Sequence, residues 1–567
     1  MTRVAKWEIF EYSMYTEKSF KNPFFEVDVT CEFTFGSLSL TADGFYDGEE
    51  NGKNVWRVRF APMIEGEWTF KTASSLAEFD GLCGSLVCTA PVSRGPLTIN
   101  KENPHWFSRA DGSPQFIVND GWFPHVGHEA LCEPLVKDDH QQPTEQDFKD
   151  FISLLSEHGV NMIVGMTQLY ARNPKVFDVT FLWPWKVVDA DNNKFDTDYF
   201  NLEYFRRWER TLEFAKTKDL FYDYELLYDD SVVRVNDWAH HPINKKNGGW
   251  LEGDEHDLGW SVMFDTENAV HMEYTKRYLK YTLARLSCFW NITWEIGAEN
   301  GNLAMLDQSR LPWAKLPDEY VANYFNVCGD YIAEHDIYSR LKTLGDVNMQ
   351  RLMVTSRHND YILTQDPRNY PRGDNAAFYN AMNAFGEKHW KFNRPVVIGE
   401  MNQLNNGHYG KERRLYWLAF VSGYIMGRSD RHFELMAEGK SYESRLYGFE
   451  KMPLIYRHLK IMSDYINSRK VAFWRMQPAD DQIRSGDLVY CLAETGKEYL
   501  IYFLYGGRCN VTLPEGKWEM EWLDPTTGVT FGPSPWRPGT KNEIEGGEQS
   551  FTCHDTEDFV LHLKKLD

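Results

Sequence analysis

Strict alternation of apolar and polar residues marks both ends of the chain. Residues 25–35 place apolar side chains at the odd positions, and residues 55–60 repeat the pattern after a turn. Period-two alternation is typical of a strand with one face buried and the other in water. The pattern returns near the end of the chain, for example over residues 518–522. We therefore predict an antiparallel β-sandwich at 1–98 and a second one at 469–567.

Between these ends, apolar runs of strand length alternate with segments whose apolar residues recur at helical spacing. A helix predicted over 204–217 is followed by a strand over 221–227, and about eight such strand–helix units fit between residues 105 and 465. Repeated units of this kind are typical of a parallel sheet covered by helices. The pattern favours a central (β/α)8 TIM barrel at 99–468. Further predicted elements are a strand-to-loop segment at 115–128, strands 161–168, 340–344 and 351–356, and helices 144–158, 270–286, 318–335, 376–389 and 413–424.

Two of the predicted barrel strands end in a glutamate. The strand after helix 270–286 ends at Glu299, and a second apolar strand ends 101 residues later at Glu400. In a barrel the reacting groups come from the carboxyl ends of several strands, so these acids could face one another across one pocket. Glycoside hydrolysis needs such a pair: one carboxyl group protonates the leaving oxygen, and the other attacks the anomeric carbon or activates water. The alternative is that each glutamate caps the next helix or pairs with an arginine at the rim.

Glu295 is the main rival to Glu299, because alternation places both on the same side of one strand. The interior of a barrel is packed, so we interpret Glu295 as a buried structural carboxylate and Glu299, nearer the rim, as the catalytic group. Other groups at strand ends could bind sugar hydroxyls or form a stacking floor, with packing at the rim as the alternative. These candidates are Asp120, Trp122, His125, His128, Gln168, His358, His432 and Glu434.

Charge and composition narrow the choice of partner. A formal charge of −22 and a pI near 5.3 disfavour nucleic acid and anionic membranes, because binding a polyanion requires clustered Lys and Arg. Aromatic residues make up 15% of the chain and include 20 Trp, which suits stacking against sugar rings. The start lacks the apolar core of a signal peptide, and no apolar run reaches about 18 residues, so we expect a cytoplasmic protein without a membrane span. The 9 cysteines lack metal-type spacing and fit reduced thiols in that compartment.

The histidines allow a weak case for a metal ion. His125 and His128 are three residues apart, and His240 and His241 precede an acidic segment at 254–257. Histidines three apart just after a strand have no fixed common face, and acids in loops are usually solvated, so we predict no catalytic metal. The sequence leaves open whether the protein binds a structural calcium ion. The chain also lacks the GxGxxG, P-loop and GxSxG patterns, and we therefore predict no cofactor.

Several stretches of the central region resemble the apiosidase-like glycoside hydrolases, which belong to a large clan of retaining enzymes with a (β/α)8 barrel. Residues 294–299 look like the end of the clan's acid/base strand, and residues 395–400 look like its nucleophile strand. The resemblance implies that Glu299 is the acid/base catalyst and Glu400 the nucleophile. It implies a separation of ~5 to 5.5 Å between their carboxyl groups, against ~6.5 to 9.5 Å for an inverting pair. Residues 413–423 and 119–123 are similar to the clan's helix after the nucleophile strand and to its first-strand loop.

The resemblance extends into both flanking domains. Residues 44–48, 59–62 and 65–68 look like a β-sandwich of unassigned function that precedes some glycosidase barrels. Residues 499–504 and 522–528 look like the sandwich that closes these enzymes, a module sometimes labelled collagen-binding. The three-domain order covers nearly the whole chain and is more specific than any single motif. For the first sandwich, glycan binding and a scaffold role are equally compatible with the pattern.

One position departs from the family pattern. Many clan members carry Asn directly before the acid/base residue, where its amide contacts the sugar 2-hydroxyl, whereas this chain carries Ala298. Asn300, Asn402 or a group on another loop could supply the contact, or the substrate lacks a normally placed 2-hydroxyl. A furanoside or a branched sugar therefore gains plausibility relative to the family's usual pyranosides.

Together these features predict a retaining glycosidase that acts on plant- or microbe-derived oligosaccharides. Exo action fits a protein that is not exported, because intact polysaccharide does not reach the cytoplasm. The competing prediction is a non-catalytic glycan-binding or scaffold protein on a glycosidase fold, since a fold can outlast its activity. The edges of the sandwiches and exposed aromatic residues permit a homo-oligomer but do not require one.

Overall fold

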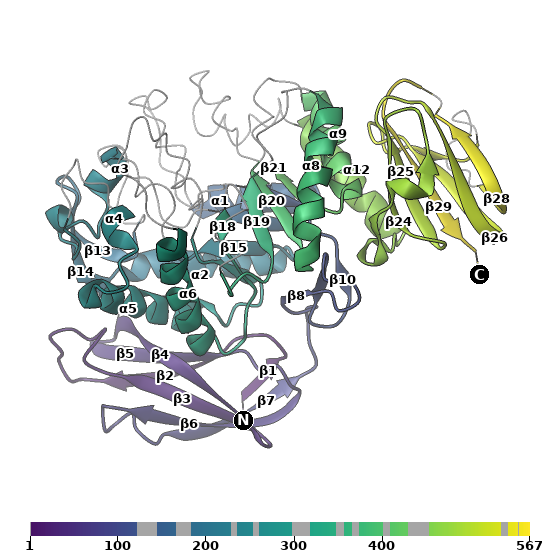
Figure 1. The fold of residues 1–567 in the computed structure, drawn as a ribbon. Coiled ribbons are helices and arrows are strands. Elements are labelled where there is room, and N and C mark those ends of the chain that lie inside the picture. Colours follow the sequence, from purple (N-terminus) through teal and green to yellow (C-terminus); the bar gives the residue numbers. More distant parts are fainter. Residues whose placement is uncertain are drawn as a thin grey trace.

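The chain forms three sheet-rich parts in sequence order. Figure 1 shows an N-terminal sheet, a central part in which helices surround a sheet, and a C-terminal sheet to one side. None of the helices in the described ranges has the length and apolar character that crossing a bilayer requires. The computed structural model describes residues 2–121, 145–165, 183–227, 235–252, 260–297, 318–346, 356–365, 374–400, 409–428, 453–533, 542–553 and 555–566.

The N-terminal sheet folds over its own core. Its strand order is β1-β7-β6-β3-β4-β5-β2, and β4 belongs to both halves, because residues 38–43 pair with β3 and residues 44–50 pair with β5. The buried faces meet where the rings of Phe33 and Phe60 stack at 4.0 Å. The alternation expected from residue 25 forms a strand only from Val29 onward. The strands are β1 (Thr2–Ala5), β2 (Phe10–Thr16), β3 (Val29–Phe35), β4 (Leu38–Glu50), β5 (Lys53–Phe60), β6 (Gly66–Ser74) and β7 (Cys83–Thr89).

The central sheet is parallel and closes on itself. Its order is β17-β16-β15-β12-β11-β21-β20-β19-β18, and the two outermost strands of this order are separated along the chain only by Leu344. The result is a barrel-like ring. With β17 and β18 counted as one strand, β16 is the fourth strand along the chain and β20 is the seventh. The strands are β11 (Asn119–Gly121), β12 (Met162–Gly165), β15 (Phe221–Glu225), β16 (Ile292–Glu295), β17 (Lys342–Thr343), β18 (Gly345–Asp346), β19 (Ile362–Gln365), β20 (Val396–Glu400) and β21 (Ile425–Arg428).

Helices cover the outer side of this ring (Figure 1). The α6 helix has the bounds that the sequence predicts, 318–335. Asparagine side chains start two others: Asn201 accepts from the backbone N–H of Tyr204 in α2, and Asn268 accepts from that of His271 in α5. The helices are α1 (Glu145–Glu157), α2 (Leu202–Thr217), α3 (Val235–His240), α4 (Trp260–Met263), α5 (Ala269–Leu286), α6 (Asp318–His335), α8 (Asn375–His389), α9 (Tyr409–Val421) and α12 (Pro453–Ser468).

A small sheet lies at the amino end of the ring. Strands β8 (Leu97–Ile99), β9 (Phe107–Arg109) and β10 (Pro114–Gln115) form it, and a separate hairpin, β13 (Trp185–Asp189) with β14 (Lys194–Phe200), precedes α2. Arg109 from the small sheet is 1% exposed and lies 4.6 Å from the ring of Phe221, the first residue of β15. Its Nη1 also pairs with Asp219 at 2.8 Å. The amino end is therefore covered, which leaves the carboxyl edge for a site.

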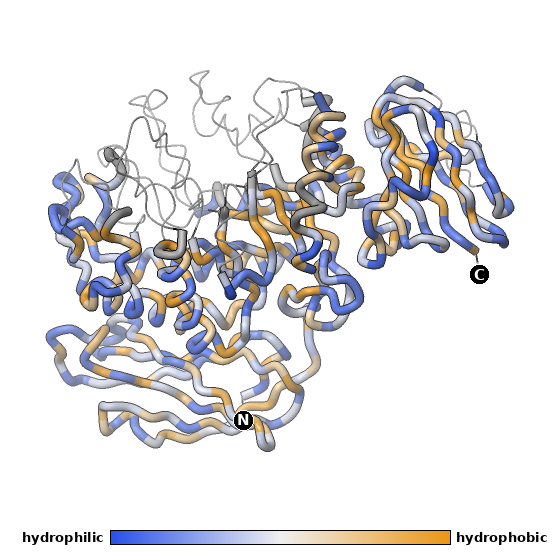
Figure 2. Tube along the Cα trace, in the orientation of Figure 1, coloured by the Kyte–Doolittle hydropathy of each residue, from blue (hydrophilic) through white to orange (hydrophobic). Residues whose placement is uncertain are grey.

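The C-terminal sheet has a core of its own. The long β26 pairs with β28, and also with β29 and β23, and its register shifts between Leu513 and Lys517. Figure 2 shows hydrophobic residues along the strands of this sheet and of the central one. The strands are β22 (Gln477–Pro478), β23 (Ile483–Arg484), β24 (Val489–Glu494), β25 (Glu498–Phe503), β26 (Arg508–Leu523), β27 (Thr530–Phe531), β28 (Asn542–Thr552) and β29 (Phe559–Lys565).

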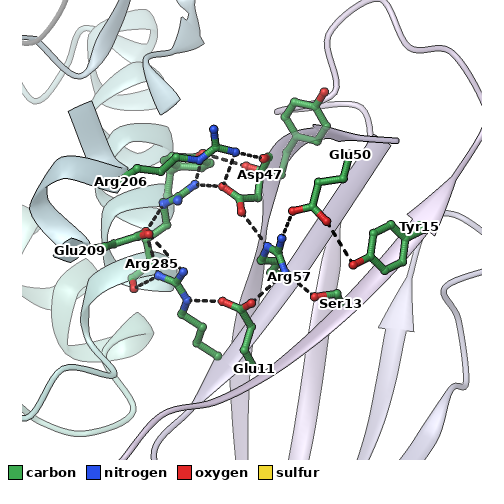
Figure 3. A network of polar contacts seen from close by, with 12 residues as sticks. Glu11, Ser13, Tyr15, Asp47, Glu50, Arg57, Arg206, Glu209 and Arg285 are labelled. Atoms are coloured by element: carbon green, nitrogen blue, oxygen red, sulfur yellow. Dashed lines mark hydrogen bonds and ion pairs between the residues drawn. The ribbon is translucent and has the colours of Figure 1, made fainter. Parts of the chain in front are cut away.

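Buried ion pairs fix both outer sheets to the central part. Figure 3 shows the N-terminal contact, in which the fully buried Arg285 of α5 pairs with Asp47 at 2.9 Å and with Glu209 at 2.6 Å. Burial alone would raise the pKa of Glu209, but Arg285 and a second arginine lower it to about 2. At the other end, Arg413 of α9 pairs with the fully buried Asp558 of the C-terminal part at 2.5 Å.

Candidate active site

The inner face of β15 carries two acids. Tyr222 and Tyr224 point to the outer side, where their rings lie 5.0 and 4.9 Å from the ring of Trp208 of α2. Because side chains alternate along a strand, Asp223 and Glu225 face the interior of the ring. Their exposed fractions are 0% and 1%, so both carboxyl groups are inside the protein.

The neighbouring strand β16 continues this acidic surface. Trp294 points outward, because its indole Nε1 donates to a carboxylate after α6 at 2.9 Å. Thr293 faces inward and donates from Oγ1 to Asp223 Oδ1 at 2.8 Å. The next inward residue is Glu295, which is 4% exposed and lies in register with Glu225. The structure therefore places Glu295 in the packed interior, as expected for a structural carboxylate.

Asp223 binds a proton more tightly than an ordinary aspartate. Its Oδ1 accepts hydrogen bonds from Tyr361 at 2.7 Å and from Thr293 at 2.8 Å, whereas Oδ2 has no hydrogen-bond partner within the described part of the chain. Burial raises the pKa of Asp223 to about 6, although the two hydroxyl donors act to lower it. The sequence-based prediction missed this residue. Alternation over Phe221–Glu225 was the available signal, because it separates the tyrosines from the acids.

The described backbone beyond β16 reaches Gly297, two residues before Glu299. Gly345 N donates to Gly297 O at 2.9 Å, so strand pairing still holds the backbone two residues before the predicted acid. Glu299 itself and Asn300 lie outside the described residues. Their roles stay predictions.

Strand β20 ends at Glu400 with an irregular register. Ile398 lies opposite Thr364 of β19, whereas Glu400 lies opposite the next residue, Gln365. Gly399 is therefore an extra residue, and the pairing has the form of a β-bulge. Bulges are frequent next to active sites, where they redirect a neighbouring side chain. Glu400 is the last residue of β20, so its backbone lies at the carboxyl end of that strand.

The inner face beside this bulge is apolar. A Cβ atom at Gly399 would lie 2.9 Å from Leu363 Cδ1 and 3.5 Å from Val164 Cγ1, so a larger residue would displace Leu363. Leu363 and Val164 are 4% and 5% exposed. The interior next to β20 is thus aliphatic, in contrast to the acidic interior next to β15 and β16.

Asp120 does not occupy the inward position that its predicted contact with substrate requires. Its Oδ2 accepts a hydrogen bond from Tyr456 of α12 at 2.7 Å, and the residue is 2% exposed. Asp120 therefore faces the covering helix. Alternation places Asn119 on the inner face instead. Its Nδ2 lies 3.4 Å from Ile398 O of β20.

His358 lies at the end of the sheet opposite the predicted pocket. The prediction placed it after a strand over 351–356, most of which lies outside the described residues; the next described strand, β19, begins after His358, at Ile362. The imidazole packs on α6, where Nε2 lies 2.8 Å from Asp330 Oδ1. This position, before a strand instead of after it, excludes His358 from the carboxyl edge.

The second histidine group proposed for a metal is only partly described. His241 is 3% exposed and lies among indole rings, 4.9 Å from Trp183 and 6.0 Å from Trp238 between ring centres. Burial lowers the pKa of His241 to about 3, so the imidazole is neutral. Within the described ranges, no three His, Cys, Asp or Glu side chains are placed to hold a metal ion. The predicted residues that lie outside the described ranges are Trp122, His125, His128, Gln168, Asn402, His432 and Glu434.

A family model covers only the beginning of the chain. The domain of unknown function DUF5060 matches residues 3–75, which is most of the N-terminal sheet. No curated protein matches the chain.

The fold of the whole chain is one that glycoside hydrolases use. A Bacteroides vulgatus protein assigned as a glycoside hydrolase aligns with a TM-score of 0.67 and 17% identity over 100% of both chains. A second glycoside hydrolase aligns with a TM-score of 0.56 and 14% identity over 83% of this chain and 97% of its own. A family 5 glycoside hydrolase from Bacteroides vulgatus aligns with a TM-score of 0.55 and 11% identity over 83% of this chain and 94% of its own. At these identities the likeness shows a shared multidomain α/β fold.

Proposed function

We propose that the protein is a retaining glycoside hydrolase. The observation that carries the proposal is the closed parallel sheet, in which the fourth strand, β16, leads towards Glu299 and the seventh strand, β20, ends at Glu400 at the same edge. In this proposal the central part, residues 99–468, is a (β/α)8 barrel of catalytic type. The sheets at 1–98 and 469–567 are flanking β-sandwiches.

The reaction proceeds in two displacements. Glu400 attacks the anomeric carbon while Glu299 donates a proton to the leaving oxygen, which breaks the glycosidic bond and forms a covalent glycosyl-enzyme. Water then attacks the anomeric carbon, Glu299 takes the proton of that water, and the carboxylate of Glu400 leaves. The sugar keeps its configuration because the anomeric carbon is inverted twice.

The polarity of the interior supports this division of roles. Asp223, Glu225 and Glu295 face inward on β15 and β16, and β16 is the strand that precedes Glu299 in the chain. In this proposal nearby carboxyl groups favour the protonated form of Glu299. A raised pKa keeps the proton on the general acid at neutral pH. The interior next to Gly399 is aliphatic, so in this proposal hydrogen-bond donors from the rim stabilise the ionised form of Glu400.

The proposed substrate is a glycoside or short oligosaccharide, cleaved from its end. Ala298 precedes Glu299 where related enzymes carry an asparagine for the sugar 2-hydroxyl. We therefore propose Asn300 or Asn402 for this contact, and a furanoside or branched sugar as the unit that is released. No cofactor takes part in this mechanism.

A second candidate is a glycan-binding protein that no longer turns over substrate. The observation that favours it is the same Ala298, because losing the contact to the 2-hydroxyl would weaken the binding of the transition state. Glycan binding that survives Glu400→Gln, together with no hydrolysis by the natural protein, would support this candidate.

A panel of aryl glycosides tests the proposal. Pyranosides and furanosides of both anomers are incubated with the natural protein, Glu299→Ala and Glu400→Ala, each with and without azide. We expect turnover of one glycoside and a loss of ~10²-fold or more in each variant. A glycosyl azide whose anomeric configuration differs between the two variants would assign the acid/base and the nucleophile.

A matched variant controls for general effects of removing an acid. Glu157, at the end of α1, is exposed, and Glu157→Ala should keep full activity. Full activity in Glu400→Ala would contradict the site, and an inverted product from the natural protein would contradict the retaining mechanism.

A further inference from the structure

A cavity of about 300 Å³ lies on the outer side of the central part, between the N-terminal sheet and α5. This volume is in the range of pockets that bind small molecules. Both parts of the protein contribute to its wall, so the cavity exists only where they pack together. Its aromatic lining comprises Phe24, Phe25, Phe45, Tyr46, Trp56, Phe200, Tyr281 and Tyr331.

The walls of this cavity are fixed relative to each other. Tyr281 of α5 donates from its hydroxyl to Tyr46 O of β4 at 2.8 Å and accepts from Arg285 Nη1 at 2.9 Å. Arg285 in turn pairs with Asp47, the residue after Tyr46, within the buried network that joins the two parts (Figure 3). The cavity is therefore preformed, and binding there would not require the protein to order itself first.

One face of α5 supplies charge to the rim. Glu273, Lys276, Arg277 and Lys280 recur at helical spacing and all line the cavity. Arg277 pairs with Glu273, and its guanidinium lies 4.4 Å from the centre of the Phe25 ring. This arginine is thus already engaged within the protein.

Two lysines on this face can bind an anion, and they differ in what already lies beside them. Lys276 forms no ion pair with any residue that the structure describes, and its Nζ lies 5.8 Å from the centre of the Tyr331 ring. Lys280 Nζ forms two long ion pairs, at 3.5 Å with Asp43 and 3.7 Å with Asp28, and a guest carboxylate would compete with these two acids. Since the lysines are four residues apart on one helix, both ammonium groups can reach a single guest carboxylate.

We propose that this cavity binds a hexuronate, a sugar ring that carries a carboxylate. The carboxylate lies between Lys276 and Lys280, and the C–H face of the sugar packs against the aromatic lining. Asp28, whose side chain is 82% exposed, and Glu273 at the rim accept hydrogen bonds from the hydroxyl groups. A bare phosphate would leave the aromatic lining uncovered, and a neutral sugar would leave Lys276 without an anion.

Titration calorimetry on the full chain tests this site without any turnover. The probes are glucuronate, glucose as its neutral counterpart, and inorganic phosphate. We expect one bound glucuronate per chain and an affinity at least ~10-fold above that of glucose or phosphate. Affinity for glucose or phosphate equal to that for glucuronate would overturn the proposal.

Two variants locate the binding. The double variant Lys276→Gln/Lys280→Gln should lose ~10-fold or more of the affinity for glucuronate. Lys218→Gln should not change it, because Lys218 also lies over a ring, 5.7 Å from that of Phe214, but outside the cavity. Unchanged affinity in the double variant would place the bound sugar elsewhere and overturn the proposal. Because no step needs hydrolysis, this result is independent of the proposed enzymatic activity.

Discussion

The two halves of the interior of the closed central sheet differ in polarity. Asp223, Thr293 and Glu295 face inward on β15 and β16, whereas Leu363 and Gly399 face inward on β19 and β20. In the first half, burial raises the pKa of Asp223 and so favours its protonated form. The second half offers an aliphatic surface. The difference indicates that the scaffold can favour a protonated carboxyl group on the β15–β16 side. On the β19–β20 side, an ionised carboxylate depends on hydrogen-bond donors at the rim.

Removing bulk from the aliphatic half should have the largest effect on stability. Leu363 is 4% exposed, and Leu363→Ala should lower the free energy of unfolding by ~2 to 5 kcal/mol. Because no titratable group changes, the loss should be the same at pH 5 and pH 8. Urea unfolding at both pH values measures it. A strongly pH-dependent loss would show that this half is coupled to a titrating group.

Replacing the buried acid in the other half should change the pH dependence of stability. The pKa of Asp223 is about 6 in the folded protein, against ~3.9 in the unfolded chain, so the folded state holds this proton more tightly. The contribution of this bound proton to the free energy of unfolding is complete below pH ~4 and is lost as the pH rises through 6. The side chain in Asp223→Asn stays neutral. The free energy of unfolding of this variant should therefore rise by ~2 to 3 kcal/mol relative to that of the natural protein between pH 4 and pH 8.

Urea unfolding from pH 4 to pH 8 also measures the effect of Asp223→Asn. Asp464→Asn, on the exposed surface of α12, serves as the control and should show no such trend. A difference between Asp223→Asn and the natural protein that does not vary with pH would mean that Asp223 is ionised throughout this range, and the contrast between the two halves would then lose its electrostatic basis.

Filling the bulge on β20 should affect catalysis more than stability. In Gly399→Val the added carbons meet Leu363, which is 2.9 Å from the position of a Cβ atom. Overpacking of this kind costs ~1 to 3 kcal/mol, and moving Glu400 by about 1 Å should lower kcat/KM by ~10²-fold. Gly486→Val is the control, because a Cβ atom there meets nothing within 4 Å. Unchanged kcat/KM in Gly399→Val would show that the bulge does not position Glu400.

The smallest effect is expected from one hydroxyl group. Thr293→Val keeps the shape of the side chain but removes the 2.8 Å hydrogen bond to Asp223. The free energy of unfolding should fall by ~1 kcal/mol, and the pKa of Asp223 should rise further, because a donor to its ionised form is lost. The carboxyl infrared band of Asp223, followed with pH and assigned by its absence in Asp223→Asn, reports the shift. A lower pKa would contradict the role given to Thr293.

Much of the fold follows from local patterns in the sequence. The α6 helix has the predicted bounds, and the alternating segment before Phe35 forms β3 once the chain leaves the loop at residues 25–28. The closure of the central sheet could not be predicted in this way. It depends on how β17 and β18, each two residues long, divide their pairing between β16 and β19, and such short contacts leave no periodic signal.

The candidate site was predictable only in part. Strand ends that carry an acid are visible in the sequence, but the face on which a side chain lies depends on register. A shift of one residue separates Asn119, which faces inward, from Asp120, which faces α12. His358 was misplaced because the prediction did not include β19, which begins four residues after the histidine, so His358 lies at the amino end of that strand.

Trapping the covalent intermediate tests the central claim most directly. The aryl glycoside that the panel identifies is prepared with fluorine at the 2-position, which slows the second displacement, and the labelled protein is digested and mapped by mass spectrometry. We predict one sugar per chain, attached to Glu400, in the peptide that contains the end of β20. A label on Glu295 or Glu299, or turnover with an inverted product and no label, would contradict the assignment.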